Sequence, residues 1–318
     1  MTSPPKTKGT APSCWEIDLN RVQSDLITVA HQAGAMILEA SKAPQSNSSL
    51  STKNNSADLV TETDQAVEAL ISKTLMSKYP TFKFYGEETF KPGMKITDAP
   101  TFIVDPIDGT TNFVHGYPYC CISLGFACAR EPRVGVVFNP FTGVLYTGVK
   151  GRGSYRIDTR LPDGDKKRKQ KLPIRPSQPL ESLSKCLVAI EYGSDRSGPN
   201  WECKLATWAN LGKSKEQGGA MIHSAHALGS AALNLCSVAT GEMDLYWEGG
   251  CWAWDVCAGW VILSEAGGVI VDGNAASWGT REVPLDHRKY LAVRGGEDQR
   301  EVIEEFWGHI VGTMDYQS

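Results

Sequence analysis

The sequence predicts a fold of mixed type, an α+β half followed by an α/β half. Between residues 18 and 160, two amphipathic helical patterns precede short apolar strands on tight connections, which is typical of an antiparallel sheet. Between residues 180 and 318, strand and helix patterns alternate, which favours an α/β layer. The 318 residues suffice for one large domain or two modest domains that share a core.

In the first half, two helices are expected before the strands. Asp18 can cap the first helix, and Thr63 or Asp64 the second. Each helix carries an apolar stripe: Val22, Leu26, Val29, Ala33 and Ile37, then Val67, Leu70, Ile71 and Leu75. The polar residues 41–56 between them predict a loop. Strands are expected at 102–104, 119–129, 134–138 and 144–149, with a turn at 139–143.

The second half begins after a connecting excursion at residues 161–179, which contains several prolines and the basic run 166–171. This run is expected to be a solvated loop, with a localisation or partner signal as the alternative. Beyond it, strands are expected at 186–192, 244–247, 269–271 and 290–293. Helices are expected from Ser230 to near Gly241, at 254–266, and at the C-terminal end.

The composition is ordinary for a globular protein in water, with 41% hydrophobic and 21% charged residues. The formal net charge of −4 supplies no general attraction to nucleic acid or to an anionic membrane. No stretch approaches the roughly 18 apolar residues that a membrane span needs. Residues 1–17 are expected to form a flexible polar tail without the apolar centre of a signal peptide. The nine cysteines form no CxxC pair, which predicts reduced, buried thiols and a cytoplasmic protein.

The most unusual stretch is DPIDGTTNF, which places two aspartates at the end of an apolar strand. Asp105 and Asp108 would repel each other by about 1–4 kcal/mol, depending on the local dielectric, without a neutralising cation. Mg²⁺ prefers carboxylate and carbonyl oxygens. Three further acids could converge on this site: Asp58, Glu87 and Asp255. Such a cluster with a nearby threonine hydroxyl predicts metal-dependent hydrolysis of a phosphate ester.

The spacing of the acids distinguishes this motif from two others. Haloacid-dehalogenase phosphatases use D-x-D-G-T, in which the acids are two positions apart, whereas Asp105 and Asp108 are three apart. An EF-hand loop needs D-x-D-x-D-G and a glutamate at position twelve, and the sequence contains no such pattern.

Together, the motifs resemble those of the inositol monophosphatase family. DPIDGTTNF is similar to its first signature, GEET at 86–89 to its glutamate motif, and WDVCAGWVILSEAGG at 254–268 to its second signature. DLVTETDQ at 58–65 and the segment 229–250 are similar to further family segments, in the same order. The resemblance extends from about residue 18 to the last helix. It implies a layered αβαβα sandwich of the sugar-phosphatase type, and a homodimer.

The resemblance also implies a role for each matched residue. Two to three Mg²⁺ ions would be held by Glu87, Asp105, the carbonyl of Ile107, Asp108 and Asp255. Thr110 would orient the attacking water, and Asp58 would accept a proton from Thr110. The substrate would contact Gly109, Thr110, Gly229, Ser230, Ala231 and Glu248. For Glu248, a surface charge at a strand end is the competing interpretation.

The implied reaction is Mg²⁺-dependent, Li⁺-sensitive hydrolysis of inositol monophosphate to inositol and phosphate by metal-activated water, as part of inositol metabolism. One alternative is a related phosphatase acting on another polyol phosphate or on a nucleotide or fructose bisphosphate, against which the TTNF after DPIDG argues. The other is a non-catalytic regulatory family member, against which the intact acids argue. The bulky Trp252 before the second signature leaves the exact polyol open.

Overall fold

The structure, a computed structural model, describes residues 13–42, 50–52, 59–176 and 178–317. Its first half contains the helices α1 (Leu19–Ala40), α2 (Glu62–Lys78) and α3 (Thr110–His115). The strands β1 (Leu50–Thr52) and β2 (Leu59–Thr61) form a two-stranded sheet. The strands of the large sheet are β3 (Lys83–Gly86), β4 (Thr101–Asp108), β5 (Cys121–Cys128), β6 (Glu131–Asn139), β7 (Val144–Val149), β8 (Ser154–Asp158) and β9 (Lys169–Lys171).

The second half contains a five-stranded sheet and four helices. Its strands are β10 (Leu187–Ile190), β11 (Ser224–His226), β12 (Leu245–Gly249), β13 (Val269–Asp272) and β14 (Lys289–Val293). Its helices are α4 (Pro199–Gly212), α5 (Ala231–Thr240), α6 (Ala253–Glu265) and α7 (Gln299–His309). The short 3₁₀ turns lie at Leu183–Lys185, Lys215–Gln217 and Trp278–Thr280.

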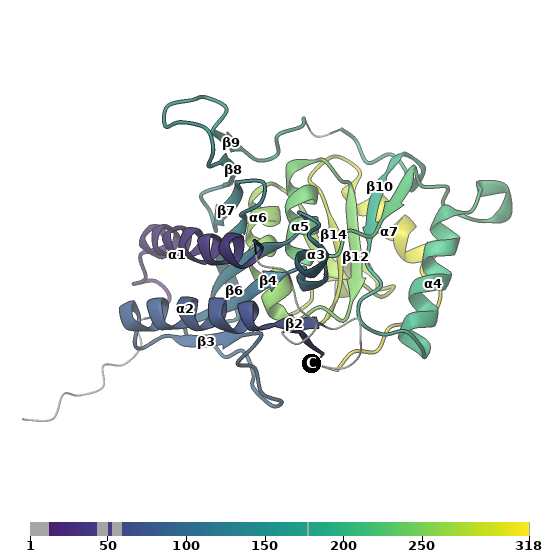
Figure 1. Cartoon of the computed structure of the whole chain (residues 1–318). Coiled ribbons are helices and arrows are strands. Elements are labelled where there is room, and N and C mark those ends of the chain that lie inside the picture. The colour runs from purple at the N-terminus through teal and green to yellow at the C-terminus, as the bar shows by residue number, and fades with distance from the viewer. Residues whose placement is uncertain (1–12, 43–49, 53–58, 177, 318) are drawn as a thin grey trace, which may run out of the picture.

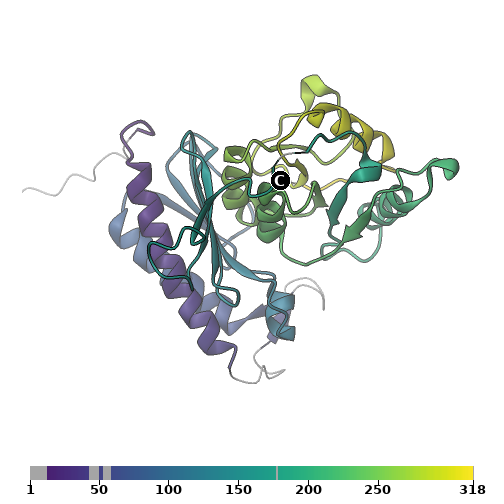
Figure 2. The ribbon, with the colours of Figure 1, turned by 90° about the horizontal axis from the view of Figure 1, so that it is seen from above.

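The elements stack as five alternating layers. In Figure 2, α1 and α2 cover the outer face of the large sheet, and α5 and α6 lie between the two sheets. The helices α4 and α7 lie beyond the small sheet, where α4 forms the edge of the molecule in Figure 1. This arrangement confirms the expected layered αβαβα sandwich.

Strand pairing in the large sheet follows chain order from β3 to β9. The expected antiparallel pattern is confirmed from β4 onward, while β3 pairs parallel to β4. In the small sheet, β10 is parallel to both β11 and β12, whereas β14 is antiparallel to β12 and β13. Part of the predicted excursion, the basic strand β9, forms an edge of the large sheet, where exposed lysines discourage pairing with another chain.

The start of α2 differs from the prediction in a way that matters for the site. Thr61 is the N-cap, not Thr63 or Asp64, and its hydroxyl accepts from the backbone N–H groups of both. The Asp64 carboxylate in turn accepts from the Thr61 N–H at 2.8 Å, which completes a capping box. The prediction failed because several consecutive residues can cap a helix and only the backbone decides between them. Asp18, by contrast, caps α1 as expected.

Strand β4 is longer than the three residues expected and includes both aspartates of DPIDGTTNF. Its pairing with β5 shifts register between Asp105 and Asp108. Pro106, which cannot donate to a ladder, lies in this irregularity. The Ile107 N–H donates to Asp105 Oδ1 at 2.9 Å. The strand therefore delivers two carboxylates to the same end of the sheet.

Helix α6 packs very close to the large sheet because glycines face it. A Cβ at Gly135 of β6 would lie 2.2 Å from the carbonyl oxygen of Ala258, and one at Gly125 of β5 would lie 2.5 Å from the sulfur of Cys257. Larger residues at these positions would push the helix outward. The close approach brings Asp255, in the first turn of α6, toward the end of β4.

Two cysteines are not free thiols, which corrects the prediction that all nine are reduced. Cys14, ahead of α1, forms a disulfide with Cys128 at the end of β5, and their Cα atoms are 5.9 Å apart. The pairing depends on how α1 packs on the sheet, which the spacing of 114 residues does not reveal. Cys120, Cys121, Cys186, Cys203, Cys236, Cys251 and Cys257 are free and buried.

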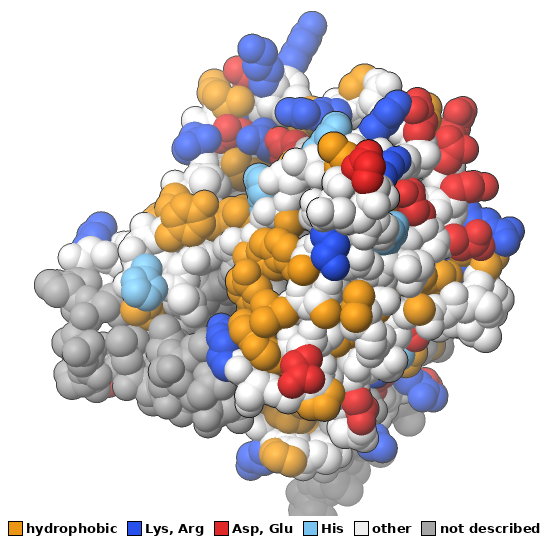
Figure 3. Space-filling model, turned by 90° about the vertical axis from the view of Figure 1, so that its right-hand side faces the viewer, with side chains coloured by type: hydrophobic (Ala, Val, Ile, Leu, Met, Phe, Trp, Pro, Cys, Tyr) orange, Lys and Arg blue, Asp and Glu red, His pale blue; other side chains and the backbone are white. Residues whose placement is uncertain are grey.

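The surface of the α4 side carries a band of hydrophobic side chains among aspartate, glutamate, lysine and arginine side chains (Figure 3). Leu205 of α4 and Met221 are among the exposed large hydrophobic residues of the protein. No helix in the described ranges has the length and apolar character needed to cross a membrane.

Candidate active site

A cavity of about 570 Å³ opens where the two halves meet. The end of β4, the segment after β3 and helix α3 form one wall. The residues after β10, the start of α5, strand β12 and the first turn of α6 form the other. Most of the residues assigned to the site from the sequence line it: Glu87, Asp108, Gly109, Thr110, Gly229, Ser230, Ala231, Glu248 and Asp255.

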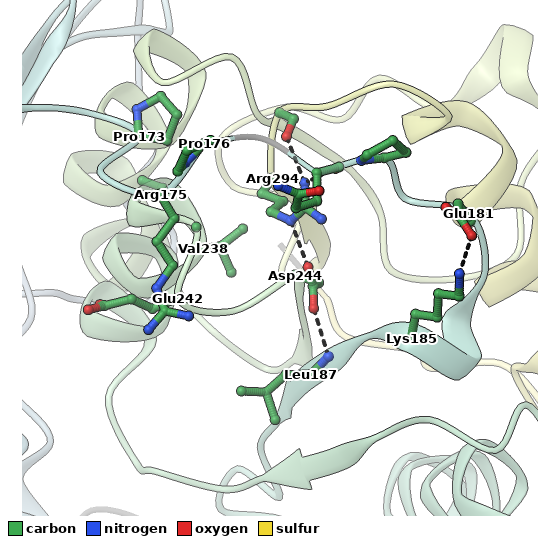
Figure 4. Close-up of a pocket in the computed structure, with 15 residues that line it drawn as sticks. Pro173, Arg175, Pro176, Glu181, Lys185, Leu187, Val238, Glu242, Asp244 and Arg294 are labelled. Atoms are coloured by element: carbon green, nitrogen blue, oxygen red, sulfur yellow. Dashed lines mark hydrogen bonds and ion pairs between the residues drawn. The ribbon is translucent and has the colours of Figure 1, made fainter.

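A second cavity, of about 620 Å³, lies between residues 173–179 and the start of β10 (Figure 4). Its principal charges are used within the fold. Arg294 pairs with Asp244 at 2.6 Å and donates to the carbonyl of Gln178, and Asp244 accepts from the Leu187 N–H. Lys185 pairs with Glu181. Paired charges of this kind stabilise the chain.

Three carboxylates of the first cavity form a compact cluster. Oxygen atoms of Asp105, Asp108 and Asp255 all lie within 4.8 Å of one another. Asp105 is only 2% exposed and Asp108 only 7%. In the part of the chain that the structure describes, no ion pair joins these aspartates to Lys, Arg or His. Buried carboxylates at this distance require neutralisation, and their oxygen-only donor set fits a hard divalent cation such as Mg²⁺.

The electrostatics of the cluster support the same conclusion. Burial raises the pKa of Asp105 well above its usual range, and the negative charges of Glu87, Asp108 and Asp255 raise it further. Burial raises the pKa of Asp108 to about 6 despite hydrogen bonds to its carboxylate. The pKa of Asp255 is also raised, by burial and by Asp108 and Glu87. Without a cation, the cluster would therefore retain protons at pH values where isolated aspartates are ionised.

The segment that carries Glu87 is held by a buried glutamate that the sequence analysis missed. Glu68 of α2 accepts from the backbone N–H groups of Glu88 and Thr89 at 2.7 and 2.9 Å. The Glu87 N–H itself donates to the Val104 carbonyl of β4 at 3.1 Å. Glu68 follows Val67 on the buried face of α2, and a charge at a core position was the available signal.

The Thr110 hydroxyl has a carboxylate neighbour that was not assigned to the site from the sequence. Its oxygen lies 3.2 Å from Asp64 Oδ1 and 3.0 Å from the Ile107 carbonyl oxygen. Asp58, expected as its partner, lies outside the described residues. Asp64 binds Thr61 through Oδ2 and faces Thr110 through Oδ1, so one carboxylate caps α2 and contacts the site. Burial raises the pKa of Asp64 to about 6.

Asp108 connects the two halves of the molecule. Its Oδ2 accepts from the Ser230 hydroxyl at 2.6 Å and from the Ala232 N–H at 2.7 Å, at the start of α5. The positive end of that helix favours a carboxylate there. Ser230 also caps α5, as expected, and its hydroxyl is buried against Asp108. Gly109 has a φ of 93°, and a Cβ on it would lie 3.0 Å from the Gly229 carbonyl oxygen.

The opposite wall carries two more buried carboxylates, Glu248 and Glu191. The Tyr246 hydroxyl donates to Glu248. Burial, with the charge of Glu191, raises the pKa of Glu248 to about 7. Glu191, which the sequence analysis missed, accepts at 2.8 Å from the N–H groups of Leu228 and Gly229. A charged residue directly after an apolar strand was the signal for it.

A five-layer αβαβα sandwich with a carboxylate cluster between its sheets defines a phosphatase, a hydrolase of phosphate esters. This chain belongs to the inositol monophosphatase family, whose sequence model matches residues 18–310. It is 49% identical over 271 residues to inositol monophosphatase 2 of Saccharomyces cerevisiae, covering 83% of this chain and 86% of the relative. It is 41% identical over 306 residues to inositol monophosphatase 1 of the same yeast, covering 94% and 99%.

Two further comparisons extend this result. The protein qutG of Emericella nidulans is 34% identical over 324 residues, covering 95% of this chain and 96% of the relative. Among solved structures, inositol monophosphatase from Anabaena (Nostoc) superposes with a TM-score of 0.70 at 26% identity, covering 93% of this chain and 98% of that one. The fold expected from the sequence is thus shared with solved members of the family.

Proposed function

We propose that this protein hydrolyses inositol monophosphate to inositol and phosphate in a reaction that requires Mg²⁺. The observation that carries the proposal is the division of one cavity into two parts. One part is lined by Asp108 and the half-buried Asp255, which form a cluster with the buried Asp105 that suits cations that bind phosphate. The other holds Glu248, whose carboxylate can accept hydrogen bonds from the hydroxyls of a polyol.

The metal ligands would be the five groups expected from the sequence: Glu87, Asp105, the carbonyl of Ile107, Asp108 and Asp255. Two Mg²⁺ ions would balance the four carboxylates, and a third would need the charge of the phosphate as well. When bound, Mg²⁺ supplies positive charge against the phosphate and lowers the pKa of a water molecule. Asp105 and Asp108 enter this site from one strand and Asp255 from another layer, so the ligand set requires the folded sandwich.

Thr110 and Asp64 supply the geometry for the attacking water. If the Thr110 hydroxyl donates its single proton to Asp64, its oxygen keeps lone pairs that can accept a hydrogen bond from water. In this arrangement the Thr110 hydroxyl orients the water, and the contact of Thr110 with the substrate would come from its backbone. The backbone at Gly109, which lines the cavity beside Thr110, would face the phosphate. Gly229, Ala231 and Glu248 would contact the polyol ring.

The name of one relative favours a second candidate substrate class, the phosphate ester of another polyhydroxylated ring. The chain is 34% identical both to qutG and to a Neurospora crassa protein named for a quinic acid degradation cluster. The same cavity wall would accept the hydroxyls of either kind of ring. The two candidates differ only in the leaving group.

A phosphate-release assay on the purified chain separates the candidates. The substrates are inositol monophosphates, a phosphate ester of a different cyclic polyol, and a nucleotide 3′,5′-bisphosphate, each with Mg²⁺ and with chelator. We expect the highest kcat/KM for an inositol monophosphate and no release with chelator. Preference for the other polyol would move the proposal to the second candidate, and release that persists with chelator would overturn the metal-dependent reaction.

Lithium offers an independent test. Li⁺ resembles Mg²⁺ in size but carries half its charge, so a carboxylate site for Mg²⁺ can admit it without full neutralisation. We expect inhibition that is uncompetitive with respect to inositol monophosphate in steady-state assays. The reason is that Li⁺ would occupy the site at Asp108 and Asp255 after the phosphate ester has been hydrolysed and would hold the phosphate there. Purely competitive inhibition, or none at millimolar lithium, would contradict this trapping. The homodimer implied by the resemblance and the cytoplasmic location expected from the cysteines stay predictions.

A further inference from the structure

A buried lysine lies directly behind the cavity wall that carries Glu191 and Glu248, here called the polyol wall. Lys204, in the middle of α4, is only 1% exposed. Its ammonium group donates to the Gly249 carbonyl at 2.6 Å and to the Tyr192 carbonyl at 3.0 Å. Lysines are rarely buried to this extent, because the charged group loses its water. The position of Lys204 therefore needs a reason beyond packing.

The two carbonyls that Lys204 binds lie immediately after the two glutamates of the wall. Tyr192 follows Glu191, and Gly249 follows Glu248. Glu191 and Tyr192 directly follow β10, and Glu248 and Gly249 end β12. These two strands are parallel neighbours in which Ile190 is paired with Trp247. One ammonium group thus holds together the ends of both strands that present a carboxylate to the cavity.

The C-terminal segment covers Lys204 from another direction. The centroid of the Tyr316 ring lies 5.3 Å from its ammonium nitrogen, within cation–π range. The same ring packs on Gly249, where an added Cβ would lie 2.8 Å from it. Asn200 and Asp315 exchange two hydrogen bonds of 2.8 and 2.9 Å, which fix this segment to α4. Tyr316 therefore helps to exclude water from the ammonium group.

The charges of this network act on one another. Glu191 raises the pKa of Glu248, and Lys204 opposes that effect. Burial lowers the pKa of Lys204, and the charge of Glu248 counteracts it. Oε1 of Glu191 accepts from Leu228, Gly229 and Asn234, while its Oε2 has no hydrogen-bond partner among the described residues. Glu191 lines the cavity, so this second oxygen can serve a ligand.

We propose that Glu191 is a specificity-determining residue beside Glu248, and that Lys204 is the positioning residue that sets the two carboxylates as paired acceptors for the hydroxyls of a polyol. Above the pKa of Glu248, which is about 7, the ionised carboxylates accept hydrogen bonds and donate none, so they favour a leaving group with several hydroxyls. A leaving group without hydroxyls gains nothing from them. This inference rests on the proposed phosphatase function and adds a selection rule to it.

The test compares two substrates, an inositol monophosphate and p-nitrophenyl phosphate, whose leaving group has no further hydroxyl. Selectivity is the ratio of their kcat/KM values. We expect Lys204→Met to lower this ratio about tenfold, mainly by raising KM for the inositol phosphate. The substitution removes the charged hydrogen bonds that position Glu191 and Glu248, and the loss of such bonds has an effect of about this size. Lys213→Met, at an exposed position just after α4, is the matched control and should leave the ratio unchanged.

Two further variants keep the proposal testable if Lys204→Met does not fold. Glu191→Gln retains an oxygen for Leu228 and Gly229 but removes the charge, and Tyr316→Leu uncovers Lys204. Both should lower selectivity in the same direction. Equal losses for both substrates, or an unchanged ratio in Glu191→Gln and Tyr316→Leu, would overturn the inference. A wild-type protein without preference for the polyol ester would instead overturn the proposed substrate class, so the two failures are distinguishable.

Discussion

Two groups of largely buried carboxylates at the cavity differ in the source of their countercharge. Asp105, Asp108 and Asp255 crowd within 4.8 Å, and within the described ranges no basic side chain forms an ion pair with them. Glu191 and Glu248 have the ammonium group of Lys204 behind them, bonded to the residues that follow each one. The first group needs a cation from solution, and the second has one built into α4.

This difference separates two tasks. A carboxylate group with an internal cation needs no metal ion to keep its geometry, which suits recognition of a leaving group. A group without one binds a mobile cation whose charge can act on the phosphate, which suits catalysis. The metal-binding group (Asp105, Asp108 and Asp255) should therefore control kcat and respond to chelation of the metal. The lysine-backed group (Glu191 and Glu248) should control KM and should not respond to chelation.

The largest expected effect is in the metal-binding group. Asp108→Asn preserves the acceptor for Ser230 and Ala232 but removes one negative charge. We expect kcat to fall on the order of 10²–10³-fold. The Tm of the metal-free protein near pH 7 should not fall, because repulsion is relieved. Steady-state kinetics and thermal unfolding check this, with the exposed Asp163→Asn as control. Near-normal kcat in Asp108→Asn would contradict the metal assignment.

The Thr110–Asp64 contact should give the next largest effect. Thr110→Val and Asp64→Asn should each lower kcat about 10²-fold with a smaller change in KM, because the pair orients water and not substrate. The double variant should be little worse than either single one, since both remove the same interaction. A rise in KM at constant kcat would make Thr110 a substrate-binding group.

Asp58→Asn completes that experiment. Asp58, the partner expected from the sequence, lies outside the described residues, and Asp64 contacts Thr110 in the structure. A loss of kcat confined to Asp64→Asn assigns the role to Asp64. A loss confined to Asp58→Asn would restore the original expectation.

A smaller effect is expected on the lysine-backed wall. Glu248→Gln retains a hydrogen-bond acceptor but loses the charge, so we expect KM for inositol monophosphate to rise about tenfold. The kcat and the Mg²⁺ concentration for half-maximal activity should change little. Titration of activity with Mg²⁺ at saturating substrate measures both. A shift in the Mg²⁺ requirement as large as that of Asp108→Asn would abolish the distinction between the two groups.

The smallest expected effect is a shift in Tm on chelation that depends on pH. The pKa of Asp108 in the metal-free fold is raised from 3.8 to about 6. Stability of the metal-free protein should therefore fall as pH rises from about 4 through 6, because the unfolded chain ionises first. Mg²⁺ should raise Tm by a few °C at pH 7.5 and less at pH 5.5. Equal shifts at both pH values would contradict the role of cluster repulsion.

The sequence by itself determined the features that depend on neighbouring residues. The caps Asp18 and Ser230 were identifiable because a cap acts within three residues of itself. The acids Asp105 and Asp108 were identifiable because two like charges at the end of an apolar strand repel each other unless a cation binds them. The layered fold followed from the order of the helical and strand patterns and from the family resemblance.

The tertiary structure alone decided which distant side chains meet. Thr110 and Asp64 are 46 positions apart, Ser230 and Asp108 122 apart, and Lys204 and Gly249 45 apart. Each contact requires two atoms at about 3 Å, a distance set by how α2, α4 and α5 pack on the sheets. Local patterns identify the face of an element that is buried, but not the atom that it meets there. The positions of Asp64, Glu191 and Lys204 in the site could therefore be found only in the folded chain.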